Sequence, residues 1–150
     1  MFNQTIQKFG YPETLVREYR HWLVLLRPAQ VTAASLVLAA KSEATAFGAL
    51  PGPAFGELAQ VIADIERTLR ELIEYERINY LMLMMVDPHV HFHVVPRYAG
   101  SRPFAGVELD DAGWPGPPDL KSAVPFVQAQ VAAGREALKS AWRSSETNSH

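Results

Sequence analysis

Three of the chain's five histidines lie within five positions, in the stretch His89-Val-His91-Phe-His93. Alternate residues of a β-strand point to the same face of a sheet, so this period of two predicts three imidazoles on one face and apolar side chains on the other. Imidazoles titrate near neutral pH and are costly to bury without partners. Three of them on one face therefore predict a functional site.

Three interpretations of this row are open. In the first, the histidines lie on the solvent-exposed face of an edge strand and have no functional role. A metal site is limited by geometry, because a strand rise of about 3.3 Å per residue places His89 and His93 roughly 13 Å apart, whereas zinc–nitrogen bonds are about 2.0–2.1 Å. The remaining histidines are His21 and His150, and the chain has no cysteine. We favour the third interpretation, a nucleophilic histidine whose neighbours bind a phosphate ester or anhydride, and we predict no metal.

The stretch Asp87-Pro-His-Val-His-Phe-His-Val-Val-Pro-Arg-Tyr98 resembles the signature of the histidine triad (HIT) family. Residues 21–27 and 35–41 resemble the two strands that precede the triad in that family, and the resemblance covers roughly residues 15–105. It implies a small nucleotide hydrolase or nucleotidyl transferase without a cofactor. The implied substrates are nucleoside phosphoramidates or dinucleoside polyphosphates, and the implied assembly is a homodimer formed through a sheet edge and a helix.

The resemblance also implies a role for each histidine. His91 would attack the α-phosphorus and form a covalent phospho-histidine. His93 would bind a phosphate oxygen and stabilise the charge that develops there, and His89 would orient or polarise the site. A neutral imidazole can attack only if its other ring nitrogen carries the proton, which a backbone carbonyl commonly accepts.

The residues around the triad depart from the family pattern. Ser35 and Glu43 stand where many members have histidines, and neither Gln nor Gly precedes the triad. Arg27 stands where many members have the Asp or Asn that binds the ribose. Arginine cannot accept a hydrogen bond but can bind phosphate, so we expect it to face the cleft of His91 and attract a second anionic group. The alternative is that Arg27 only pairs with a surface carboxylate. A HIT-fold module that binds nucleotide or metal with little turnover is the alternative. The candidate substrate-binding residues are Arg27, Asn79, Ser35 and Arg97.

The elements that must position these residues follow from apolar runs and periodicity. In chain order we expect a short helix over 14–20, strands over 21–27 and 34–40, a long helix over 54–77, a buried strand over 78–86, the histidine strand, a loop over 99–118 with Trp114 as an anchor, and a helix over 126–142. Successive strands joined by short turns indicate an α+β fold. We predict a HIT-like antiparallel sheet of about five strands with one long covering helix and a C-terminal helix.

Composition narrows the class of protein further. With 150 residues, of which 48% are hydrophobic and 20% charged, the chain is expected to form one domain over 1–143 with a disordered tail over 144–150. A net charge of -2 gives no support for nucleic-acid binding. The absence of cysteine fits a reducing cytoplasm, and we find neither a signal-peptide pattern nor an apolar run of about 18 residues. We therefore expect a cytoplasmic protein that does not bind membranes.

Overall fold

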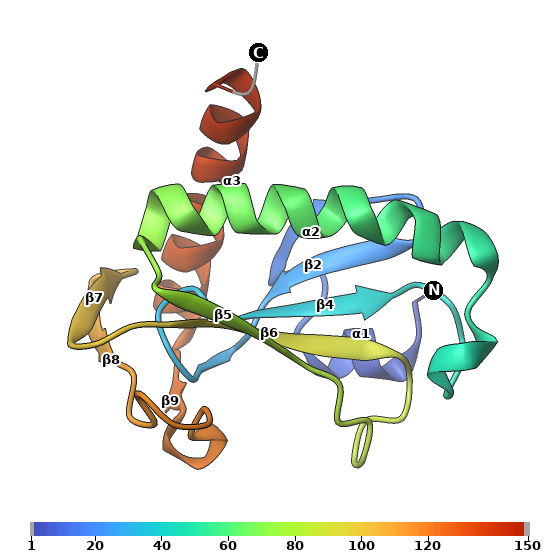
Figure 1. Cartoon of the computed structure of the whole chain (residues 1–150), viewed down its shortest axis with the longest axis horizontal. Coiled ribbons are helices and arrows are strands. Elements are labelled where there is room, and N and C mark those ends of the chain that lie inside the picture. Colours follow the sequence, from blue (N-terminus) through green and yellow to red (C-terminus); the bar gives the residue numbers. More distant parts are fainter. Residues whose placement is uncertain (1, 149–150) are drawn as a thin grey trace.

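A five-stranded antiparallel sheet forms the centre of the structure, a computed structural model that describes residues 2–148 (Figure 1). Its strands are, in spatial order, β1 (Leu15–Glu18), β2 (Trp22–Leu26), β4 (Leu36–Ala40), β6 (His91–Arg97) and β5 (Arg77–Leu81). Two short antiparallel pairs lie outside this sheet: β3 (Ala29–Gln30) with β9 (Val124–Pro125), and β7 (Ser101–Phe104) with β8 (Val107–Asp110). The predicted α+β fold with a five-stranded antiparallel sheet is confirmed.

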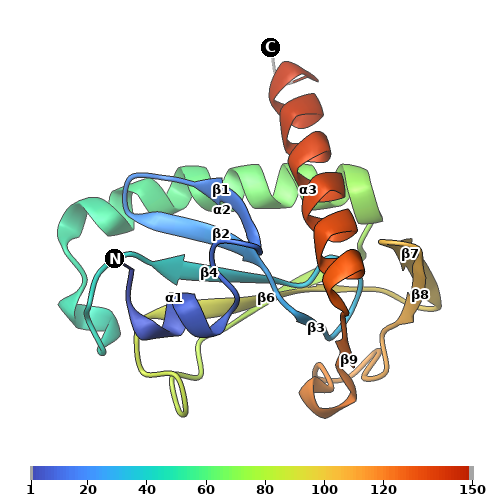
Figure 2. The same cartoon turned by 180° about the vertical axis from the view of Figure 1, so that it is seen from behind.

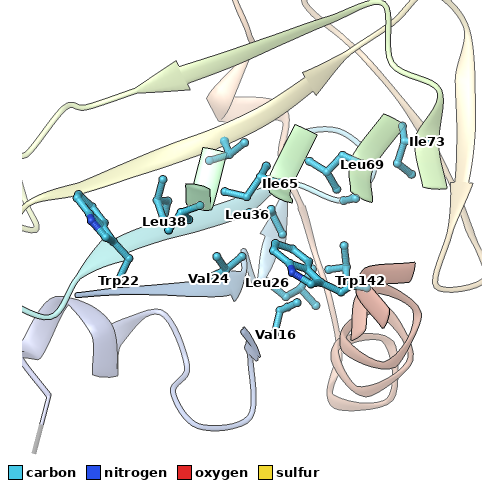
Figure 3. Close-up of a cluster of buried hydrophobic side chains, with 14 of the residues drawn as sticks. Val16, Trp22, Val24, Leu26, Leu36, Leu38, Ile65, Leu69, Ile73 and Trp142 are labelled. Carbon is cyan, nitrogen blue, oxygen red and sulfur yellow. The ribbon is translucent and has the colours of Figure 1, made fainter. Parts of the chain in front are cut away.

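Helix α2 (Gly52–Ile73) covers one face of the sheet. Its buried residues Val61, Ile65, Leu69 and Ile73 recur at every fourth position and form one apolar stripe. The stripe packs on alternate residues of β2 and β4, as Figure 3 shows. The helix ends at Glu74, which adopts a left-handed conformation with φ 54°. The long helix expected over 54–77 is therefore present with shifted ends.

Helix α3 (Gln128–Asn148) crosses α2 and contacts β1 and β2 (Figures 1 and 2). Leu138 and Trp142 are buried and anchor it in the same core as α2. The helix continues through residues 144–148, for which we expected a disordered tail, and residues 149–150 lie outside the described part of the chain.

The opposite face of the sheet is covered by α1 (Gln4–Lys8), a short helix without a counterpart among the expected elements. Asn3 caps it by accepting a hydrogen bond of 3.0 Å from the amide of Ile6. Ile6 is fully buried against the other set of alternate strand residues, which are Leu23, Leu25, Val37 and Ala39. The sheet is thus buried on both sides, by α2 on one and α1 on the other.

One expected element is wrong, and another is too long. The helix expected over 14–20 is strand β1, because its backbone pairs with β2 and its side chains alternate, with Val16 buried in the core. The strand expected over 78–86 ends at Leu81. Beyond it Met84 adopts φ 50°, and Met85 and Val86 are 85% and 82% exposed, so this apolar run is mostly loop.

Other segments match more closely. The strands expected over 21–27 and 34–40 correspond to β2 and β4, and the helix expected over 126–142 corresponds to α3. The loop expected over 99–118 contains the β7–β8 hairpin, and Trp114 within it is half-buried. Within residues 2–148 no helix is both long and apolar enough to cross a membrane.

Candidate active site

Strand β6 carries His91 and His93 on the face of the sheet that α1 covers. His91 pairs across the sheet with Ala39, and His93 pairs with Val37. Both partners belong to the apolar cluster around Ile6, so the two imidazoles point to the α1 side. His91 is 1% exposed and His93 is 7% exposed. The alternation expected from the sequence is confirmed for these two residues.

The two imidazoles line one cavity of about 200 Å³, together with the loop that precedes β6. Their ring centroids lie 5.1 Å apart, with the ring planes at 79°. Whole-ligand pockets measure about 300–1,000 Å³, so this cavity suits the reacting part of a ligand better than a complete nucleotide. The other residues that line it are Leu83, Met84, Met85, Val86 and Asp87.

The protonation state of the His91 ring follows from its hydrogen bond to the backbone. Nδ1 of His91 lies 2.7 Å from the carbonyl oxygen of His89. A carbonyl oxygen can only accept, so Nδ1 must carry the proton. In the neutral ring Nε2 then holds the lone pair, which is the state that a nucleophile needs.

His93 has the opposite arrangement. The Nε–H group of Arg27 donates to Nδ1 of His93 at 3.2 Å. Because a guanidinium can only donate, Nδ1 of His93 is the acceptor, and the proton of the neutral ring sits on Nε2. Burial, followed by the charges of Arg27 and His91, lowers the pKa of His93 to about 4. His93 is therefore neutral near pH 7 and offers one N–H donor.

His89 is not part of this cavity. It precedes β6, and its ring lies between α1 and the loop after β4, with Nδ1 2.9 Å from Oγ1 of Thr5 and Nε2 3.5 Å from a carboxylate oxygen of Glu43. It lines a separate, open cavity of about 530 Å³ together with Glu43 and residues of the N-terminal segment. The structure thus brings two of the three histidines together and places the third between Thr5 and Glu43.

Helix α1 and the residue after it contact the triad segment, residues 87–93, at three points. Thr5 meets His89, as described above. Lys8 forms an ion pair of 2.7 Å with Asp87, which lines the cavity. Phe9, at the end of the helix, has its ring centroid 5.6 Å from those of both His91 and His93. The N-terminal segment therefore packs against the residues that carry the histidines without lining their cavity.

Among the candidate substrate-binding residues, Arg27 contacts His93 but does not line the cavity of about 200 Å³, contrary to the expectation that it faces the cleft of His91. The other three candidates lie elsewhere. The guanidinium of Arg27 also donates from Nη1 to the carbonyl oxygen of Ala29. The hydroxyl of Ser35 is buried and donates to the carbonyl oxygen of Thr32 at 2.8 Å. Ser35 therefore stabilises the turn between β3 and β4.

Arg97 and Asn79 lie at the other end of β6, in a buried polar network. The guanidinium of Arg97 binds both carboxylate oxygens of Asp111, at 2.7 and 3.1 Å. It also donates to Oδ1 of Asn79 at 2.7 Å and to the carbonyl oxygen of Gly116 at 2.8 Å. These contacts attach the long segment after β8 to the sheet.

The donor set around the histidines does not form a metal centre. Among residues 2–148 no three or more His, Asp or Glu side chains are arranged to hold one ion. His91 and His93 have hydrogen-bond partners at Nδ1, and His89 points into another cavity.

Sequence reasoning missed the residues that come from α1 and from the loop before β6. The one local signal for α1 was Asn3, a residue type preferred at helix N-caps. Nothing in the sequence indicates that Thr5 and Phe9 meet histidines more than eighty positions away, a separation of 84 for Thr5 and His89.

The fold is shared with solved structures of histidine triad proteins. A histidine triad protein from Marinobacter aquaeolei VT8 aligns with a TM-score of 0.73 and 23% identity, over 96% of this chain and 98% of that one. A hypothetical histidine triad nucleotide-binding protein from Sulfolobus tokodaii aligns at 0.69 and 14%, over 93% and 90%. A zinc-bound histidine triad family protein from Mycobacterium smegmatis aligns at 0.65 and 19%, over 95% and 93%. By sequence, no family model and no curated protein matches. The chain therefore has the histidine triad fold.

Proposed function

We propose that this chain is a divergent histidine triad enzyme that cleaves a phosphoramidate or phosphoanhydride bond of a nucleotide through a covalent intermediate on His91. One observation carries the proposal. In a single cavity, a histidine whose Nε2 holds a lone pair stands beside a neutral histidine whose Nε2 carries a proton. The shared fold supports it, as does the description of the Sulfolobus tokodaii protein as nucleotide-binding.

In the first step, the lone pair on Nε2 of His91 forms a bond to phosphorus, and the bond to the leaving group breaks with its electron pair. A phosphate leaving group departs as an anion, whereas an amine takes up a proton from solvent. The imidazole becomes positively charged, and the charge-assisted hydrogen bond from Nδ1 to the His89 carbonyl stabilises it. In the second step, water attacks the phosphorus and the bond between phosphorus and Nε2 of His91 breaks, with its electron pair returning to Nε2. A nucleoside monophosphate is released, and the proton lost by the water passes to solvent.

His93 acts in this scheme as a hydrogen-bond donor. Its Nε2–H group donates to a phosphoryl oxygen and stabilises the negative charge that accumulates there in the transition state. It does not serve as the acid, because a neutral imidazole that gives up this proton becomes an anion. Arg27 adds positive charge behind His93.

A second candidate function is nucleotide binding with little turnover, and the composition of the cavity wall favours it. Leu83, Met84, Met85 and Val86 contribute no side-chain hydroxyl or amide to a phosphate group. The carboxylate of Asp87 repels an anion, although the ammonium of Lys8 at 2.7 Å offsets this charge. Product release separates the two candidates, since a binding module forms a complex without a burst of product.

The test is a panel of adenosine and guanosine phosphoramidates and dinucleoside polyphosphates, assayed with and without EDTA. We expect hydrolysis that survives chelation, because the described residues place no three or more His, Asp or Glu side chains around one ion position. We expect His91→Ala to lose turnover by at least about a thousand-fold while keeping its fold and much of its nucleotide affinity. Mass spectrometry of wild-type protein quenched during turnover should detect a nucleotidyl adduct on His91.

The matched control is His21→Ala. His21 lies in the turn between β1 and β2, where its amide donates to Glu57 and its ring is remote from the cavity. This variant should keep wild-type activity and the adduct. Full activity in His91→Ala would rule out the covalent mechanism. Nucleotide binding without product from any substrate would support the second candidate, a nucleotide-binding module.

A further inference from the structure

The loop between β5 and β6 presents four consecutive apolar residues, Leu83 to Val86, beside the reactive histidines. Met85 is 85% exposed, Val86 is 82% exposed and Leu83 is 48% exposed. Loops are normally polar, and contiguous apolar side chains kept in water indicate a recognition surface. Packing in the core therefore does not account for these exposed apolar residues.

The backbone of the loop supports the same conclusion. Met84 adopts φ 50°, a left-handed conformation that is unfavourable for residues with a Cβ atom. Unfavourable backbone conformations of this kind persist where the surroundings hold them, and they concentrate at ligand sites. Met84 is partly buried against the core, so the loop has a defined position in which its neighbours face outward.

The position of the loop relates it to the chemistry. The same four side chains and Asp87 form one wall of the cavity of about 200 Å³ in which His91 and His93 form the other. A group bound to the phosphorus that His91 attacks must therefore pass along this wall. Its side chains offer contact area but no hydrogen bond, apart from the carboxylate of Asp87, which Lys8 already binds.

We propose that this loop binds an apolar leaving group, an alkyl or aryl amine attached to the reacting phosphorus. The inference rests on the proposed function and specifies its substrate class. Of the two substituents on the phosphorus, the nucleoside carries ribose hydroxyls and base edges that would lose hydrogen bonds to water against this wall. An alkyl or aryl group loses none. Methionine side chains are flexible and polarisable, so Met84 and Met85 can adapt to apolar groups of different shape.

The first experiment measures kcat/KM for adenosine phosphoramidates whose leaving amine lengthens from methyl to hexyl. We expect a rise of about two- to four-fold per methylene over the first few carbons, the range that burial of a methylene allows. A hydroxyl at the end of the chain should reverse the gain. The variants Met85→Gln and Val86→Thr should flatten the dependence on chain length. The matched control is Val127→Thr, which changes a residue that is 63% exposed and does not line the cavity. This variant should keep the wild-type dependence on chain length.

The second experiment does not require turnover. It measures binding of alkylphosphonates of the same chain lengths and follows the methionine methyl signals by NMR. Affinity that rises with chain length, with shifts at Met84 and Met85, supports the inference even if no substrate is cleaved. Hydrolysis at equal rates for all amines, or binding that ignores chain length, overturns the inference and leaves the proposed function standing.

A third outcome is measured on the same samples. If Met85→Gln and Val86→Thr lower the mass seen by light scattering but keep the dependence on chain length, the loop is covered by a second copy of the chain and the inference is wrong. A last outcome separates the two proposals. If affinity rises with chain length but neither turnover nor the His91 adduct is detected, the proposed enzymatic function is wrong and the apolar subsite is supported.

Discussion

Two imidazoles in one cavity have opposite proton positions at Nδ1 because these atoms face different partners. The carbonyl oxygen of His89 requires a proton on Nδ1 of His91, and the guanidinium of Arg27 requires a lone pair on Nδ1 of His93. One Nε2 can therefore attack while the other donates. At the scale of single residues, Arg27 is the group that makes the two histidines differ.

Replacing Arg27 tests this assignment. In Arg27→Met the side chain keeps much of its length but loses its charge and its N–H groups. The pKa of His93 should rise above the wild-type value of about 4, because one of the causes that lower it is removed. NMR titration of the His93 ring measures this pKa, and long-range proton–nitrogen spectra report which nitrogen carries the proton. An unchanged pKa and an unchanged tautomer would show that Arg27 does not control His93.

Arg27 also tests the expected second anionic group. If it attracts further phosphate or carboxylate, Arg27→Asp should weaken binding of anionic substrates by more than about ten-fold, in line with loss of a charge-assisted contact and the gain of a repulsive one. Comparison of dissociation constants for nucleoside monophosphates and polyphosphates measures this effect. An unchanged ratio of these dissociation constants would mean that Arg27 interacts with His93 but not with the substrate.

The same histidine predicts how stability depends on pH. The pKa of His93 is about 4 in the folded chain and 6.5 when unperturbed, so between these values the unfolded chain binds more protons. The contribution of His93 to stability is fully present above pH 6.5 and is lost as the pH falls toward 4. In His93→Gln the free energy of unfolding should fall less steeply across this window than in wild type. Urea unfolding at several pH values measures both slopes, and equal slopes would contradict the assignment.

At the scale of elements, α1 holds the site by its position on the sheet. Thr5, Lys8 and Phe9 reach the triad segment, while Ile6 on the same helix is fully buried against β2 and β4. The apolar anchor and the polar contacts thus come from one five-residue helix. A helix this short is not stable alone, so its packing must hold it in place.

Truncation of the anchor should therefore affect both stability and activity. Ile6→Ala removes a fully buried side chain and should lower the free energy of unfolding by about 2–5 kcal/mol. Turnover at temperatures where the variant is still folded should also fall, since α1 no longer fixes Phe9 against the histidines. Urea unfolding and kcat measured in parallel report the two effects. Gln4→Ala, at an exposed position of the same helix, is the control and should change neither.

At the scale of the whole molecule, the sheet leaves β1 and β5 as edge strands. An edge strand exposes backbone groups that another strand can pair with, and β5 is only partly buried along its length. We predict a two-fold symmetric homodimer. Light scattering at micromolar concentration should give about twice the chain mass of 16.7 kDa. A mass equal to that of one chain would show that the edge is protected in another way.

The sequence predicted those parts of the molecule whose signals are local. Alternation placed His91 and His93 on one face, and a stripe at every third or fourth position identified α2. Strand β1 was missed because its conformation depends on pairing with β2, which no local pattern reports. The loop before β6 was taken for a strand because apolar residues usually indicate burial, and here they are exposed. The position of Arg27 against His93 required the fold itself.

The hydrogen bond that fixes the His91 tautomer is accepted by a main-chain oxygen rather than by a side chain. Every amino acid at position 89 supplies that oxygen, so the proton on Nδ1 of His91 does not depend on which side chain residue 89 carries. Replacement of His89 therefore keeps this acceptor and removes the contact of the His89 ring with Oγ1 of Thr5. A library of variants at position 89 would therefore change the lining of the adjacent cavity of about 530 Å³ while the acceptor that sets the His91 tautomer is kept.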